Sequence, residues 1–547
     1  MVLRPVPTPS AGLPAAWTHA AILRLPMAPP IQASRLYSVH AGRIQYRSRY
    51  NPHRSRIPPI SRLQLRTFAS DTSKASDSEG AKAAHKIESE TDSAANAAKS
   101  PDEPHSQKPQ VTNVTSTTST DSDLDWEEKP NFHIEKFTEL PYQNFGVNQH
   151  MIIDREFKEV LRQLLWRFRA PIRYAFAYGS GVFPQSKGGT ATEAEIKAVH
   201  PRAPLAVQRA QDGSPKMIDF IFGVSYTQHW HSLNLMQHRD HYSMLGSLGS
   251  AAVSYVQDKW GAGVYFNPYV TVDGILIKYG VVNIDTLCRD LSEWDTLYLA
   301  GRLQKPVKIL RDDPRVRLAN QINLLSALRT ALLLLPPTFT EQQLYATIAG
   351  ISYLGDPRMA FPTENPKKVA NIVNHNMLNF RRLYAPLIES LPNVIYDDPA
   401  TSKPDWITNT DSVLKIQQDM DPVKRGNMVR RLPKAFRSKL YFEYQKKFQI
   451  PQLEFDKMME ENKDEDAISF KRQQGGGFEQ RIAQDDPEAL RNTVRDVIRK
   501  TINWPSTTQS LKGILTSGFR RSLRYLGEKI AKYRESSKPR KESEKSS

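Results

Sequence analysis

The sequence predicts a mixed α/β fold, and the evidence for it is the spacing of the apolar residues. One helical repeat and four strand-like runs follow one another: the helix at 154–168, then the strands at 175–178, 217–224, 264–272 and 274–282. Helices repeat apolar residues every three to four positions, whereas strands alternate or are apolar throughout. The block from 305 to 400 is helical in pattern. We therefore expect an α/β domain over 130–304 and a helical domain over 305–400.

Each predicted element has a visible boundary. The first helix ends before Pro171, because proline disfavours a helical backbone in the residue before it. A polar insertion, 186–214, separates the first two strands. Thr340 and Gln343 have capping-box spacing, which is typical of a helix start. Beyond residue 400 the sequence predicts a helical and irregular extension over 401–504 and a basic final segment over 505–547.

The N-terminal part is expected to lie outside the fold. Residues 1–70 contain ten arginines, no lysine and no acidic residue. This composition is typical of a mitochondrial transit peptide, which we place at 1–68, although an unrelated basic tail would look the same. Residues 69–129 have almost no large apolar side chains. Such a segment cannot bury enough surface to offset the entropy of ordering, so we predict a disordered linker.

The net charge of +17 is confined to the two ends of the chain. Residues 505–547 hold eleven basic and four acidic residues, and without both ends the middle, 71–504, has no net charge. A nucleic-acid enzyme would be expected to have a basic body, so we expect no nucleic-acid partner. No apolar run reaches 18 residues, which argues against a transmembrane helix. The single cysteine, Cys288, excludes an intrachain disulfide.

A turn and a strand together point to nucleotidyl transfer. The first strand runs into Gly179, Ser180 and Gly181, and Asp219 lies in the second strand. Glycines let backbone amides approach a triphosphate, and a small serine donates a hydrogen bond without filling the space. A carboxylate nearby can hold Mg²⁺ against the same phosphates. We therefore expect Gly179, Ser180 and Gly181 to bind phosphate, and Asp219 to be catalytic and to ligate Mg²⁺.

The magnesium site has only one obvious acid. Nucleotidyltransferases usually have two acids separated by one residue, whereas Asp219 is followed by Phe220 and Ile221. Substrate phosphates, waters or a distant acid must then complete the site. Asp273 and Asp285 are candidates for that distant acid.

Several stretches resemble one enzyme family. They are 174–185, 218–224, 230–234, 241–243, 261–267, 276–281, 299–308, 348–353 and 355–359. In this order they resemble the mitochondrial phosphatidate cytidylyltransferases, also described as the translocator assembly and maintenance family. The resemblance covers about 140–395 and a short piece near 505–520.

The resemblance implies a DNA polymerase beta-type nucleotidyltransferase domain followed by a winged-helix-like domain. It implies that CTP and phosphatidic acid become CDP-diacylglycerol, for cardiolipin synthesis, at the matrix face of the mitochondrial inner membrane. It also places His231, His241, Tyr242 and Ser243 around the active site as nucleotide or phosphate contacts, although structural packing explains them equally well. Two other histidines lie close by in the sequence, but their spacing matches no closed zinc site.

Four basic residues are candidate phosphate ligands. Lys278 lies in an apolar strand, where burial without an anion would be costly; we expect it to be catalytic, with a lysine reaching out from a strand edge as the alternative. Arg302, Lys305 and Lys308 form a basic turn that suits the triphosphate or the phosphatidate headgroup. A solvated helix start would have the same spacing.

The C-terminal segment repeats apolar residues at helical spacing with cations between them. The residues expected to bind the membrane are Leu511, Leu515, Phe519, Arg520, Arg521, Leu523 and Arg524. A basic amphipathic helix of this kind can lie among the headgroups of an anionic lipid surface. The alternative is a core helix with a solvated basic face.

Two rival functions remain at this point. One is a nucleotidyltransferase acting on RNA or protein, which the neutral middle of the chain disfavours. The other is a non-enzymatic factor that supports assembly of the inner-membrane protein translocase, for which Asp219 would be dispensable.

Overall fold

The computed structural model describes most of the chain beyond residue 130. The described residues are 126–127, 130–185, 190–211, 213, 215–359, 367–409, 413–458, 476–518 and 527. The predicted transit peptide lies outside them, as does the predicted linker apart from Trp126 and Glu127. None of the described helices is both long enough and apolar enough to cross a membrane.

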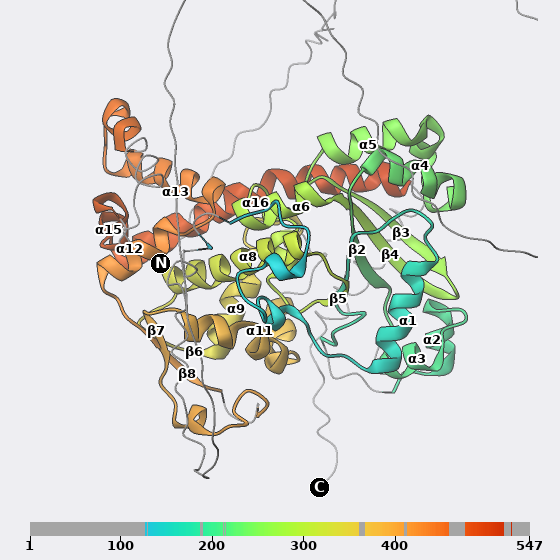
Figure 1. Ribbon diagram of the computed structural model, residues 1–547, viewed down its shortest axis with the longest axis horizontal. Coiled ribbons are helices and arrows are strands. Elements are labelled where there is room, and N and C mark those ends of the chain that lie inside the picture. Colours follow the sequence, from blue (N-terminus) through green and yellow to red (C-terminus); the bar gives the residue numbers. More distant parts are fainter. Residues whose placement is uncertain are drawn as a thin grey trace, which may run out of the picture. The chain divides into compact units, whose positions relative to one another are not determined.

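A five-stranded sheet forms the α/β part of the molecule (Figure 1). Its strands, in spatial order, are β3 (Val264–Val272), β4 (Ile275–Asn283), β2 (Ile218–Val224), β1 (Tyr174–Tyr178) and β5 (Lys308–Arg311). β2 and β4 are parallel, and every other neighbouring pair is antiparallel. The four predicted strands are confirmed to within two residues. β5 was not predicted, and it extends the sheet past the boundary expected at residue 304.

Helices surround this sheet. They are α1 (Arg155–Trp166), α2 (Glu193–Val199), α3 (Leu205–Ala210), α4 (Thr227–Gln237), α5 (Gly249–Lys259) and α6 (Ile284–Glu293), with short 3₁₀ turns η1 (Phe137–Glu139), η2 (Val147–Gln149), η3 (Arg239–His241) and η4 (Met244–Leu248). α1 begins where Asp154 accepts a hydrogen bond from the Phe157 amide. On one sheet face Phe222 and Tyr279 stack on each other, and the Trp230 ring of α4 packs against both. The polar insertion is not merely a loop, since it contains α2 and α3.

The next part of the chain is built around one buried helix, α8. Its elements are α7 (Ala300–Leu303), α8 (Pro314–Leu334), α9 (Glu341–Ile351), η5 (Pro357–Met359), α10 (Lys368–Asn374), α11 (Met377–Ser390), η6 (Pro399–Ser402) and a small antiparallel sheet of β6 (Thr338–Thr340), β8 (Lys415–Gln418) and β7 (Val394–Tyr396). The capping box of Thr340 and Gln343 is confirmed at the start of α9. Arg381 of α11 pairs with Glu341 of α9, and both side chains are fully buried.

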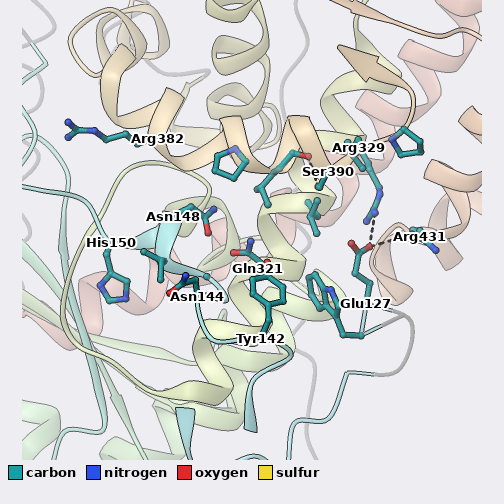
Figure 2. A pocket seen from close by; sticks show the side chains of 18 residues that line it. Glu127, Tyr142, Asn144, Asn148, His150, Gln321, Arg329, Arg382, Ser390 and Arg431 are labelled. Atoms are coloured by element: carbon teal, nitrogen blue, oxygen red, sulfur yellow. Dashed lines mark hydrogen bonds and ion pairs between the residues drawn. The ribbon is translucent and has the colours of Figure 1, made fainter. Parts of the chain in front are cut away.

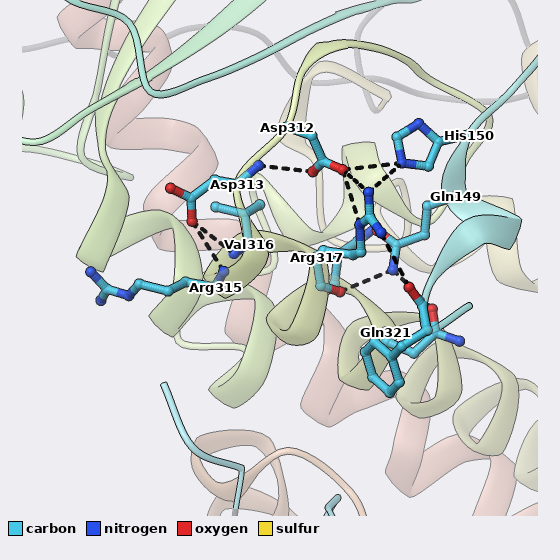
Figure 3. Close-up of polar contacts among 10 residues, drawn as sticks. Gln149, His150, Asp312, Asp313, Arg315, Val316, Arg317 and Gln321 are labelled. Carbon is cyan, nitrogen blue, oxygen red and sulfur yellow. Dashed lines mark hydrogen bonds and ion pairs between the residues drawn. The ribbon is translucent and has the colours of Figure 1, made fainter. Parts of the chain in front are cut away.

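Asp312 and Asp313 fix the junction between β5 and α8 (Figure 3). Asp313 caps α8 and accepts a hydrogen bond from Arg173, which precedes β1, at 2.6 Å. Asp312 pairs with Arg317 and with His150, whose Nε2 lies 3.1 Å from the carboxylate. Burial alone would raise the pKa of Asp312, but the hydrogen bonds from His150 and Arg317 bring it below its usual value. The residue before β1 is therefore tied to the N-cap of α8 by an ion pair.

The C-terminal part is helical. It contains α12 (Pro422–Arg430), α13 (Lys434–Lys447), α15 (Gly477–Ala483) and α16 (Pro487–Ser517). α16 crosses the boundary expected at residue 504 and packs along β3, where the Gln509 amide donates to the Val264 carbonyl at 3.1 Å.

Candidate active site

Asp219 and Lys278 are neighbours on one face of the central sheet. They occupy paired positions on the parallel strands β2 and β4, so their side chains point the same way. The Lys278 ammonium lies 3.4 Å from the Asp219 carboxylate and 4.7 Å from the centre of the Phe266 ring. The Asp219 side chain is 26% exposed and that of Lys278 is 20% exposed, so the pair is partly shielded from water and yet open to a ligand. The strand lysine thus has a carboxylate beside it.

The Gly-Ser-Gly turn meets this carboxylate directly. Tyr178, the last residue of β1, pairs with Asp219 across the sheet. Gly179 follows with a φ of +79°, and a Cβ there would lie 3.5 Å from the Asp219 carboxylate. A Cβ on Gly181 would lie 2.7 Å from the Met217 carbonyl, so Gly181 is required by close approach, whereas Gly179 is favoured by its positive φ. Half-buried Ser180 lies between them. The expected meeting of turn and acid is confirmed.

Arg302 lies near the same sheet face, where it contacts Tyr178. Its Nε lies 3.4 Å from the Tyr178 hydroxyl, and its guanidinium lies 4.0 Å from the centre of the Tyr298 ring. Burial raises the pKa of Tyr178, while the nearby Arg302 charge opposes that shift. Because Tyr178 and Asp219 share a face, Arg302 is placed where it can meet an anion bound beside the acid.

Lys305 and Lys368 extend this basic cluster. The Lys305 ammonium donates to the Ser352 hydroxyl at 2.9 Å and to the Gly301 carbonyl. It also lies 5.2 Å from the Tyr353 ring centre, and Lys368 of α10 lies 5.1 Å from that centre. Burial, assisted by the charges of Arg302 and Lys368, lowers the pKa of Lys305 to about 7. Several cations held so close together favour an anionic ligand such as a phosphate.

Sequence reasoning missed Lys368, Tyr178 and Tyr353 as parts of this site. Tyr178 could have been found, because it immediately precedes the Gly-Ser-Gly turn and must therefore lie beside it. Lys368 could not have been found from the sequence. It follows the segment 360–366, far along the chain from Asp219, and no spacing relates the two residues.

Lys308 does not join the cluster. It pairs with Ala177 in the sheet, which places it on the face opposite Tyr178. Its ammonium donates to the Met151 carbonyl, and burial lowers its pKa to about 8. The expectation that Lys308 contacts the substrate is corrected by this placement, because strand alternation turns it away from Asp219.

The predicted histidine and tyrosine contacts also lie on the opposite face. The His231 ring bonds to the Tyr242 hydroxyl at 2.8 Å and to Gln257 at 2.7 Å, and burial lowers its pKa to about 4. His241 bonds to the hydroxyl of Tyr279, the strand neighbour of Lys278, at 2.9 Å. Alternation along β4 therefore puts these side chains across the sheet from Asp219.

The placement corrects the expectation that these residues surround the nucleotide. His231, His241 and Tyr242 form a buried hydrogen-bond network that packs α4 onto the sheet. The hydroxyl of Ser243 donates to the Leu515 carbonyl at 2.9 Å and so holds α16.

Two other metal expectations can be placed. His238, Asp240 and His241 are the one group of three potential metal ligands found among the residues that the structure describes. However, the two imidazole rings stack 4.3 Å apart and nearly parallel, so their in-plane lone pairs do not converge. Asp273, in the β3–β4 turn, pairs with Arg167, which follows α1. Asp285 follows β4 at the end away from Asp219, so the two carboxylates are not brought together.

The cavity shown in Figure 2 is separate from this site. It has a volume of about 740 Å³ and lies between the 142–148 segment, α8 and α11. Glu127 and Arg329 pair at 2.6 Å on its wall, and His150 links it to Asp312. Asp312 follows β5 near the start of β1, whereas Asp219 lies beside the end of β1. None of the predicted catalytic residues lines this cavity.

The end of α16 is organised differently from a core helix. Leu511 and Leu515 are exposed, whereas Lys512 is buried. The Lys512 ammonium donates to the carbonyls of Gln257 and Trp260, at 3.2 and 2.6 Å. A core helix with a solvated basic face would show the reverse. The other predicted membrane contacts, Phe519, Arg520, Arg521, Leu523 and Arg524, lie outside the described residues.

Comparisons with known proteins show which family the chain resembles. The family model described as "Phosphatidate cytidylyltransferase, mitochondrial" matches residues 161–532. Proteins of that name from Xenopus laevis, Saccharomyces cerevisiae and Mus musculus are 36%, 40% and 34% identical to this chain. The aligned regions cover 68%, 54% and 68% of this chain, and 93%, 74% and 94% of the relatives. The chain therefore belongs to the mitochondrial phosphatidate cytidylyltransferase family.

Proposed function

We propose that this protein is a phosphatidate cytidylyltransferase, which converts CTP and phosphatidic acid to CDP-diacylglycerol and pyrophosphate. The observation that carries the proposal is the meeting of Asp219, the Gly179–Gly181 turn and the Arg302 and Lys305 cations on one sheet face. One carboxylate beside several phosphate-binding groups suits a nucleoside triphosphate better than it suits a neutral substrate. The names of the relatives supply phosphatidate and the cytidylyl group.

The chain's own residues would bind and orient the two phosphates. The Ser180 hydroxyl and the backbone of the turn hold the triphosphate, while Arg302 and Lys305 offset its negative charge. An oxygen of the phosphatidate phosphate attacks the α-phosphorus of CTP and forms a new P–O bond. The bond between the α-phosphorus and the bridging oxygen breaks, and pyrophosphate leaves with the electron pair. A phosphomonoester has a second pKa near about 6, so the nucleophile is ionised at neutral pH and needs no strong general base.

Magnesium is proposed as the cofactor. Mg²⁺ is commonly held by one or two carboxylates together with substrate phosphates and waters, so the single Asp219 carboxylate fits it. The Gly179 backbone leaves the approach to that carboxylate open. When bound, the ion would neutralise charge on the triphosphate. Lys278 lies 3.4 Å from the same carboxylate and would orient it.

The finer setting is also proposed. The mixed sheet with its Gly-Ser turn and acid suits a DNA polymerase beta-type nucleotidyltransferase domain, and α9 and α11 beside the small β6–β8–β7 sheet suit a winged-helix-like domain. We place the protein peripherally on the matrix side of the inner membrane, where its product would feed cardiolipin synthesis. The Arg-rich residues 1–68 support import into mitochondria, and the exposed Leu511 and Leu515 support contact with an anionic lipid surface.

The test is product formation with defined acceptors. Purified protein receives radiolabelled CTP and Mg²⁺ together with phosphatidic acid in liposomes, an RNA, or a protein acceptor. We expect labelled CDP-diacylglycerol only with phosphatidic acid, and equimolar pyrophosphate. Transfer of label to RNA or protein without any lipid product would overturn the proposal.

A further inference from the structure

Large apolar side chains project from η4 and α5 on the surface of the catalytic domain. Met244 and Leu248, at the two ends of η4, are 89% and 72% exposed, and Tyr255 of α5 is 61% exposed. Single exposed apolar residues are ordinary, but several on adjoining elements mark an interaction surface. η4 leads directly into α5, and the two pack against each other. We refer to Met244, Leu248 and Tyr255 as the η4–α5 projection.

The end of α16 is fastened to the same elements. Ser243, the residue before η4, donates to the Leu515 carbonyl, and buried Lys512 donates to the carbonyl of Gln257 in α5. Leu511 and Leu515 remain exposed, whereas buried Lys512 fastens α16 to α5. The end of α16 thus lies beside α5 (Figure 1), and its contacts with Ser243 and Gln257 place Leu511 and Leu515 on the elements that adjoin the η4–α5 projection.

The charge of the residues that follow α16 indicates which kind of partner this region contacts. The described part of α16 ends at Ser517, and a Cβ on Gly518 would lie 3.6 Å from Ser243. Residues 519–547, which start there, contain ten basic and four acidic residues. Apolar tips next to a strongly cationic segment match the two layers of an anionic bilayer, with the tips among the acyl chains and the cations among the headgroups.

We propose that the η4–α5 projection and the last turns of α16 enter an anionic bilayer together, so that the catalytic domain itself docks on the membrane. The inference rests on the proposed function only in assuming a lipid surface as the site of work. Docking through the domain fixes its orientation, whereas docking through the C-terminal segment alone would leave the domain free to rotate above the surface.

A site-specific fluorescent label tests this placement. The only native cysteine, Cys288, is buried, and burial raises the pKa of its thiol to about 12, so it will react poorly. Leu248→Cys and, as a matched control, Leu205→Cys each receive a polarity-sensitive fluorophore. Leu205 lies at the start of α3 and is 67% exposed, close to the value for Leu248.

The labelled full-length proteins are mixed with phosphatidylcholine vesicles that contain phosphatidylglycerol, without CTP or phosphatidic acid. We expect a blue shift at position 248 and none at position 205. Binding without a shift at position 248 would overturn the proposal, and so would equal shifts at both positions or a lack of vesicle binding. Since no turnover is measured, failure here is separate from failure of the proposed reaction.

A second variant measures how much the projection contributes. Met244→Asp combined with Leu248→Asp should lower binding to the same vesicles about tenfold or more, because two apolar side chains no longer leave water. Leu205→Asp should bind as the wild type does. Turnover of a short-chain, water-soluble phosphatidic acid should be unchanged in both, which shows that the active site is intact. Wild-type binding by the double variant would overturn the proposal.

Discussion

The pKa of Lys305 should be visible in the pH dependence of CTP binding. Burial and the charges of Arg302 and Lys368 lower this pKa to about 7, so Lys305 is a cation below neutral pH and is neutral above it. If the ammonium binds the triphosphate, affinity must fall as pH rises through 7. The protonated fraction drops from about one half at pH 7 to about one tenth at pH 8, which predicts about a fivefold rise in Kd, or roughly 1 kcal/mol.

The comparison that isolates this effect is Lys305→Arg. A guanidinium stays charged throughout the range, so the variant should show a flatter profile between pH 6.5 and 8.5. Titration calorimetry with CTP and no lipid acceptor measures both proteins at each pH. The titration of CTP itself is common to both and cancels in the ratio. Identical profiles for wild type and Lys305→Arg would refute the assignment of Lys305 to the triphosphate.

Four further substitutions test other parts of the structure. Gly179→Ala places a side chain at a φ of +79° next to the Asp219 carboxylate, so turnover should fall sharply while the free energy of unfolding drops by about 1–2 kcal/mol. Gly350→Ala in α9, where a Cβ meets nothing within 4 Å, should raise the free energy of unfolding by about 0.5–1 kcal/mol. Denaturant unfolding and turnover measure both variants. His231→Ala leaves Tyr242 and Gln257 without their buried hydrogen-bond partner, so the free energy of unfolding should fall by about 1–3 kcal/mol, measured by thermal unfolding. Loss of turnover with unchanged stability would instead indicate that His231 takes part in the reaction. Glu341→Gln leaves the charge of fully buried Arg381 without a counterion, so the free energy of unfolding measured in urea should fall by about 3–5 kcal/mol. A loss below about 1 kcal/mol would contradict the buried pair.

Local patterns were enough to predict the elements that carry the motif. The apolar repeat of α1, the capping box of α9 and the strands that flank Gly179 and Asp219 all depend on residues close in sequence. The short strand β5 escaped because it has four residues, too few for a periodic signal. The small β6–β8–β7 sheet escaped because its strands have only three or four residues and also come from distant parts of the chain.

The composition of the site was less predictable, because sheet register decides it. Whether Lys278 or Tyr279 faces the turn depends on a pairing with β2 that spacing alone does not reveal. The same alternation turned Lys308 away and placed His231 and His241 across the sheet. Lys368 comes to the site through the packing of α9 and α10, which is a tertiary effect.

The most direct measurement compares CDP-diacylglycerol formation by the wild type and by Asp219→Asn, with Asp285→Asn as the matched control. Asp285 is also an acid with a basic partner, Arg315, but it lies at the far end of β4. With CTP, Mg²⁺ and phosphatidic acid in liposomes, we expect turnover to fall at least a hundredfold for Asp219→Asn, about 2.7 kcal/mol in the barrier, and to stay near wild type for Asp285→Asn. Wild-type turnover by a folded Asp219→Asn protein would contradict the assignment of this sheet face as the active site.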